Sequence, residues 1–155
     1  MLKGGDMISH ILVASDGSKT SQKAARFAMG LARQTGSKLT LLAVIDRNSL
    51  VSRFMPASAS PTHLIQPVED YLRQAAKAFL EKIGEACQKN GIGHQIRIGT
   101  GHPVEEIVKT AQKVGADLIV LGSHGRTALQ ASILGSVTFG VVNKDSKIPV
   151  LVVRQ

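Results

Sequence analysis

The most constraining feature of the sequence is an alternation of short apolar runs with longer segments of helical period. This alternation predicts parallel β-strands joined by crossover helices. We expect five strands, at residues 11–14, 38–45, 94–98, 117–121 and 149–153. Apolar stripes at helical spacing predict four helices, at residues 18–35, 68–89, 104–114 and 135–144.

The apolar pattern of each strand also indicates its place in the sheet. A strand covered on both faces can be apolar throughout, whereas an exposed edge tends to alternate. Residues 94–98 alternate, while residues 11–14 and 117–121 are nearly continuous apolar runs. With right-handed crossovers, this pattern gives the strand order 3-2-1-4-5. The predicted fold class is therefore α/β, a flavodoxin-like or Rossmann-like sandwich with a five-stranded parallel sheet and four helices.

The composition favours one compact domain over residues 1–155. The chain has 155 residues, 43% of them hydrophobic, and a single cysteine, Cys87, which excludes an intramolecular disulfide framework. A reducing compartment such as the cytoplasm is the default for such a chain. We expect residues 1–6 to be a flexible N-terminal extension. Residues 47–66 contain several serines and prolines, and we expect a long loop there.

The charge of the chain favours anionic partners such as nucleotides. The sequence has 19 Lys and Arg against 11 Asp and Glu, a formal net charge of +8. With one tyrosine and no tryptophan it lacks an aromatic stacking set, which argues against a nucleic-acid partner. The longest uncharged run, residues 127–143, is shorter than the roughly 20 apolar residues of a bilayer span, so we expect no membrane segment.

Two glycine-containing loops follow the strands at the centre of the predicted sheet. A ligand crevice forms at the carboxyl ends of parallel strands where neighbouring connections leave in opposite directions, here between the first and fourth strands. Residues 14–18 and 122–125 arrive there, and Gly135 and Ser136 open the next helix. Glycines let main-chain N–H groups approach a ligand, and a helix start favours an anion. The pattern predicts a lysine-free phosphate site; the alternative is turn glycines with an ordinary helix cap.

The spacing Gly122-x2-Gly125-x9-Gly135-Ser136, with Asp-Gly-Ser at residues 16–18, resembles the universal stress protein family. Residues 7–18, 116–127 and 148–154 resemble the opening, central and closing segments of that family. The glycine motif is typical of its ATP-binding branch. The resemblance implies an ATP-binding regulatory module of the stress response, with Mg²⁺ or Mn²⁺ accompanying ATP and an unknown protein client.

The resemblance also implies a nucleotide site whose residues fall into three groups. Adenine would lie against Ala14, Ser15, Asp16 and the main chain of Val44. The sugar would lie against Leu121, Gly122 and Ser123. The phosphates would be held by Gly125, Gly135, Ser136 and the N–H of Val137.

Other interpretations stay open. Asp16, in an Asp-Gly-Ser before a helix, is also what helix capping selects, and His124 would donate to a phosphate or simply face solvent. The sequence has no Walker lysine motif and no evident catalytic set, so we expect binding and not fast turnover. The alternatives are a slow ATPase or phosphotransfer enzyme, with His124 or Asp16 as proton acceptor, and a nucleotide-free dimerisation module.

The last strand predicts an interaction with a second copy of the chain. Val150 to Val153 carries no charge or interruption of the kind that protects a sheet edge. An isologous homodimer that extends the sheet would cover this edge. The alternative is a well-packed edge beneath helices.

Overall fold

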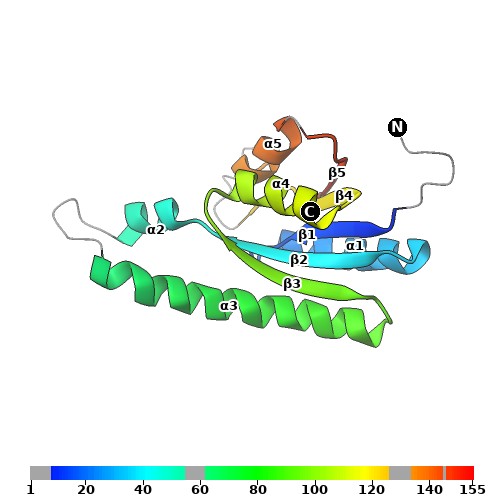
Figure 1. Cartoon of the computed structure of the whole chain (residues 1–155), viewed down its shortest axis with the longest axis horizontal. Coiled ribbons are helices and arrows are strands. Elements are labelled where there is room, and N and C mark those ends of the chain that lie inside the picture. The colour runs from blue at the N-terminus through cyan, green and yellow to red at the C-terminus, as the bar shows by residue number, and fades with distance from the viewer. Residues whose placement is uncertain (1–7, 55–61, 126–133, 145) are drawn as a thin grey trace.

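The computed structural model describes residues 8–54, 62–125, 134–144 and 146–155. Strands and helices alternate over this part of the chain (Figure 1). The strands are β1 (His10–Ala14), β2 (Lys38–Ile45), β3 (His94–Thr100), β4 (Leu118–Gly122) and β5 (Val150–Val153). The helices are α1 (Lys19–Thr35), α2 (Arg47–Phe54), α3 (Thr62–Lys89), α4 (Pro103–Val114) and α5 (Ser136–Asn143).

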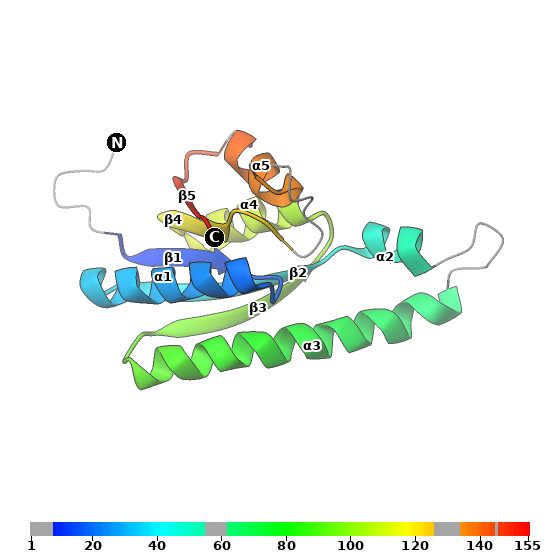
Figure 2. The same cartoon turned by 180° about the vertical axis from the view of Figure 1, so that it is seen from behind.

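The sheet has the predicted topology. All neighbouring strands are parallel, and their order is β3-β2-β1-β4-β5, which confirms the predicted fold class. In the centre, Ile11 of β1 lies opposite Leu39 of β2 and Leu118 of β4. Helices α1 and α3 lie on one side of the sheet, and α4 and α5 lie on the other (Figures 1 and 2).

Two apolar layers hold these helices to the sheet, because successive side chains of a strand point to opposite faces. Ile11 and Val13 pack with α1 and α3, whereas Leu12 packs with α4 and α5. Helix α1 contacts the sheet mainly through alanines, which let it lie close to the strands: Ala24, Ala25, Ala28 and Ala32, all at most 2% exposed.

The prediction of a long loop over residues 47–66 is wrong in part. Helix α2 occupies residues 47–54 and α3 begins at Thr62, so the described part of the chain has five helices and not four. Asp46 caps α2, since its carboxylate accepts hydrogen bonds from the main-chain N–H groups of Asn48 at 3.0 Å and Ser49 at 3.3 Å. Helix α3 continues through Pro67, although a proline more often marks the first turn of a helix.

Two segments named in the sequence analysis lie outside the part of the chain that the structure describes. Residues 1–6, expected to be a flexible extension, and residues 55–61 of the expected loop lie outside the described residues. Among the described helices, none combines the length and the apolar character needed to cross a bilayer.

A buried histidine lies at the amino end of the sheet. His10 is 3% exposed, and its Nε2 lies 2.7 Å from Oγ1 of Thr40, which also accepts a hydrogen bond of 2.8 Å from Nε2 of Gln95. Burial disfavours the imidazolium form, and the nearby Lys38 repels it. Together these effects lower the pKa of His10 below its ordinary value.

This shift predicts a pH-dependent stability. The unfolded chain binds a proton at His10 more readily than the folded chain, so the free energy of unfolding decreases as pH falls below about 6.5. We expect the wild type to lose more stability between about pH 7.5 and about pH 5.5 than a His10→Gln variant. The difference between the two slopes is at most about 1.4 kcal/mol per pH unit. Urea unfolding at both pH values measures it, and equal slopes for the two proteins would contradict the assignment.

Candidate functional site

The candidate site lies at the carboxyl ends of β1 and β4. From β1 the chain passes into α1 on one face of the sheet, whereas α5, which follows β4, packs on the other face. A cavity of about 500 Å³ opens at this position. Its volume falls in the range typical of small-molecule sites, roughly 300–1,000 Å³.

The structure brings together ten of the eleven site residues expected from the sequence. These residues line the cavity: Ala14, Ser15, Asp16, Val44, Leu121, Gly122, Gly125, Gly135, Ser136 and Val137. The eleventh, Ser123, is buried at 2% exposure, and its hydroxyl lies 3.0 Å from Nδ1 of His124. His124, rather than Ser123, forms part of the cavity wall.

The loop after β1 is ordered by its own side chains. Ser18 is the N-cap of α1, and its hydroxyl accepts a hydrogen bond of 3.2 Å from the N–H of Ser21. Asp16 orders the turn before this cap, since its Oδ1 accepts a hydrogen bond of 2.9 Å from the N–H of Ser18. Gly17 adopts a φ of 79°, which favours glycine. Asp16 is therefore not the helix cap, and the turn it orders holds its carboxylate at the cavity wall.

The glycines at the end of β4 and just after it are required by close packing. A Cβ on Gly122 would lie 2.9 Å from Cγ2 of Thr20 and 3.0 Å from the main chain of that residue, so glycine lets α1 approach the end of β4. A Cβ on Gly125 would lie 2.8 Å from Oδ2 of Asp16. The two loops at the crevice therefore touch, and a larger residue at position 125 would displace the Asp16 carboxylate.

The start of α5 presents main-chain donors to the cavity. Its N-cap is Gly135, with a φ of −66° and a ψ of 160°, and no described side chain caps the helix. The N–H of Gly135 donates to the carbonyl oxygen of Ser123 at 2.7 Å, so this amide is engaged within the protein. The first N–H groups of a helix have no acceptor within it. Ser136 and Val137 bring such groups to the cavity wall, where the helix dipole favours an anion.

The charge of the cavity differs from that of the chain. Among its described lining residues the ionisable side chains are Asp16, Asp46 and His124, with no lysine or arginine. Over the same part of the chain, no three His, Cys, Asp or Glu side chains meet as a metal site. An anion bound here would depend on main-chain N–H groups and the α5 dipole.

A second wall of the cavity was not expected from the sequence. This wall lies on the α1 and α3 side of the sheet. It is lined by Leu72, Phe79 and their neighbours on α3 and by Leu50 on α2. The apolar stripe of α3 is visible in the sequence, but it predicts only a buried face and not a cavity beyond the end of a strand.

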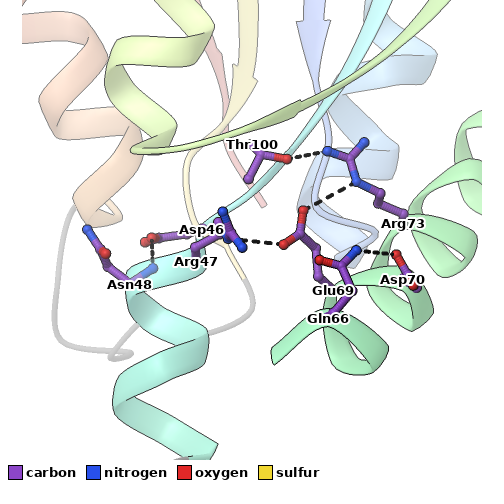
Figure 3. Close-up of polar contacts among 8 residues, drawn as sticks. All are labelled: Asp46, Arg47, Asn48, Gln66, Glu69, Asp70, Arg73 and Thr100. Carbon is purple, nitrogen blue, oxygen red and sulfur yellow. Dashed lines mark hydrogen bonds and ion pairs between the residues drawn. The ribbon is translucent and has the colours of Figure 1, made fainter. Parts of the chain in front are cut away.

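A buried carboxylate fixes this second wall. Glu69 of α3 is 7% exposed; its Oε2 lies 3.1 Å from Nε of Arg47 on α2, and its Oε1 lies 3.5 Å from Nε of Arg73. Arg73 also donates to Oγ1 of Thr100 at the end of β3. Figure 3 shows these contacts joining α2, α3 and the end of β3. Glu69 thus holds together the elements that flank the cavity.

Loss of the Glu69 charge is expected to weaken this connection. Glu69→Gln removes the partner of two arginines, and we predict a decrease of roughly 1–2 kcal/mol in the free energy of unfolding. Asp70→Asn is the matched control, because Asp70 is exposed and its described hydrogen bond is a 3.1 Å contact with Gln66 on the same helix. Denaturant unfolding should show a change below about 0.5 kcal/mol for this control. Equal effects of the two substitutions would argue against a connecting role for Glu69.

Comparisons with known proteins agree with the geometry. Residues 7–154 match the model of the Universal stress protein family. Universal stress protein MJ0577 of Methanocaldococcus jannaschii is 34% identical over 157 residues, covering 96% of both chains. A solved structure of MJ0577 superposes with a TM-score of 0.84 at 33% identity, covering 97% of this chain and 98% of that one.

Two further relatives extend the comparison. Universal stress protein YxiE of Bacillus subtilis is 33% identical over 153 residues, covering 96% of this chain and 100% of the relative. A universal stress protein solved in complex with cAMP is 25% identical, with a TM-score of 0.67, covering 96% of this chain and 98% of that one. The chain belongs to the universal stress protein family.

Proposed function

We propose that this protein is an ATP-binding regulatory module of the universal stress type, which binds the nucleotide at the crevice between β1 and β4 without fast turnover. One observation carries the proposal: ten residues expected to surround a nucleotide line a single cavity of about 500 Å³. The family relative solved with cAMP supports an adenine nucleotide as the ligand class. The proposal includes a cytoplasmic location and a protein client that responds to nucleotide occupancy.

The polar part of the cavity suits the two ends of ATP. The N–H groups of Ser136 and Val137 at the start of α5 serve the phosphates, next to Gly125. Asp16 and the main chain of Val44 serve the adenine, whose exocyclic amine is a donor and whose ring nitrogens are acceptors. The polar wall of the cavity therefore offers N–H donors for phosphate oxygens and a carboxylate acceptor for the adenine amine.

Binding without fast turnover follows from the cavity's side chains. Fast phosphoryl transfer requires neutralisation of the charge that spreads over the phosphate oxygens. None of the described lining residues is a lysine or an arginine that would provide it. Since the described residues form no cluster of three metal-binding side chains, Mg²⁺ or Mn²⁺ would arrive with ATP, held mainly by phosphate oxygens and water.

Replacement of the first helical residue of α5 tests the role of its main-chain amide. Ser136→Pro removes that N–H at the helix position that best tolerates proline, and Gly135 already has the extended conformation favoured before proline. A lost hydrogen bond to a charged group predicts an ATP affinity at least roughly tenfold weaker by calorimetry in the presence of Mg²⁺.

Ser136→Ala is the matched control, because it removes the hydroxyl and keeps the N–H. We expect its ATP affinity to stay within about threefold of wild type, with the free energies of unfolding of both variants close to wild type. Equal ATP affinities for Ser136→Pro and wild type would contradict the role of this amide. Absence of saturable ATP binding by the wild-type protein would remove the proposed function itself.

We further propose a homodimer through β5, which is an edge strand of the described sheet. Val150, Leu151 and Val152 are only half-buried, although all are apolar. The carbonyl oxygens of Pro149 and Val153 accept hydrogen bonds of 2.9 Å from the N–H groups of Ile119 in β4 and of Ser123 directly after it. The main-chain groups of residues 150 and 152 therefore point outward. These groups are available to a second copy of the strand.

Proline at position 152 tests the dimer without breaking the pairing of β5 with β4. Val152→Pro removes an outward N–H, and we expect it to shift the protein from dimer to monomer in sedimentation experiments. Val152→Thr keeps the N–H and the side-chain shape, so this control should remain dimeric. A monomeric wild type, or a dimeric Val152→Pro variant at the same concentration, would contradict this proposal.

A further inference from the structure

The cavity reaches both faces of the sheet at the end of β2. Val44 packs with the layer on the α4 and α5 side, while Ala43 packs with the layer on the α1 and α3 side. Both residues line the cavity. We call the part on the second side the α3 lobe, defined by these residues: Ala43, Leu50, Leu72, Ala75, Ala76 and Phe79.

The α3 lobe exists because small side chains interrupt an apolar stripe. Leu72, Ala75, Ala76 and Phe79 follow the spacing i, i+3, i+4 and i+7, so they share one face of α3. Ala76 is buried in the core, whereas the small side chain of Ala75 leaves space between Leu72 and Phe79 that a larger side chain would fill. Ala75 remains exposed and Leu72 and Phe79 only half-buried, although all three belong to the cavity wall.

The wall of the α3 lobe is connected to α2 and β3 through the Glu69 contacts. Glu69 lies one helical turn before Leu72, and Arg73 directly follows Leu72. Through these residues α3 is tied to Arg47 of α2 and to Thr100 of β3. Leu72 and Phe79 keep part of their apolar surface exposed, so this wall gains contacts and loses exposed area when an apolar group enters.

We propose that the α3 lobe binds a compact apolar group alongside the nucleotide. Its six side chains offer no hydrogen-bond donor or acceptor, so they select against polar groups. This binding rests on the proposed function, because ATP is assigned to the remaining, polar part of the cavity. The apolar group is carried by the nucleotide itself or belongs to a separate small molecule.

A neutral fluorescent probe, N-phenyl-1-naphthylamine, tests the lobe in the full chain. Wild-type protein should bind it saturably, both without ATP and with saturating ATP. Ala75→Leu fills the lobe and should weaken probe binding at least roughly tenfold. Ala78→Leu is the matched control, since Ala78 is an exposed alanine on the same helix and does not line the cavity. It should bind probe like wild type, and all three proteins should bind ATP equally.

N6-benzyl-ATP distinguishes the two sources of the apolar group. If the nucleotide carries the group, this compound binds the wild type roughly tenfold more tightly than ATP, and Ala75→Leu loses that gain. If the group is a separate molecule, N6-benzyl-ATP gains nothing and the naphthylamine binds together with ATP. Both results support the lobe.

Equal probe binding by wild type, Ala75→Leu and Ala78→Leu would overturn the inference, and so would displacement of the probe by ATP. A parallel loss of ATP affinity in Ala75→Leu would also overturn it. The inference fails as well if the wild type binds no probe saturably and gains no affinity for N6-benzyl-ATP. Failure of the wild type to bind ATP, with probe binding still sensitive to Ala75→Leu, would instead remove the proposed function and leave the lobe as an apolar site.

Discussion

The site depends on one constraint: after β1 and after β4 the chain continues on opposite faces of the sheet. Helix α1 packs on one face of the sheet and α5 on the other, so no single helix covers the ends of these two strands. The loops that remain there must pack on each other, and they do so through glycines: Gly125 lies against Asp16, and Gly135 bonds to Ser123. The crevice is thus a consequence of topology, and the glycines make it compact.

Two different physical environments meet in this crevice. Main-chain amides at the start of α5 and the carboxylate of Asp16 lie at its polar end, without a described lysine or arginine beside them. Apolar side chains of α2 and α3 lie at the other end, held by the buried Glu69 between Arg47 and Arg73. The net charge of +8 therefore favours anions over a distance, whereas at short range the described cavity wall offers them main-chain N–H groups and no lysine or arginine.

Much of this arrangement is predictable from the sequence because it rests on periodicity. Apolar runs and stripes predict the strands, their order and most helices, and the glycine spacing predicts which loops meet. Helix α2 escapes prediction because its apolar pattern is weak, although Asp46 is a residue type favoured at the N-cap of a helix. The bond from the Gly135 N–H to Ser123 and the α3 lobe depend on tertiary packing, which no local pattern encodes.

The central claim is that the amides at the start of α5 receive the phosphates of ATP. Amide chemical shifts of ¹⁵N-labelled protein, titrated with Mg²⁺ and ATP, measure this directly. The account predicts saturable shifts that are largest at Ser136 and Val137, with amides at the far end of the sheet, such as that of Lys38, unchanged. Saturable ATP binding that leaves the Ser136 and Val137 amides unperturbed would contradict it.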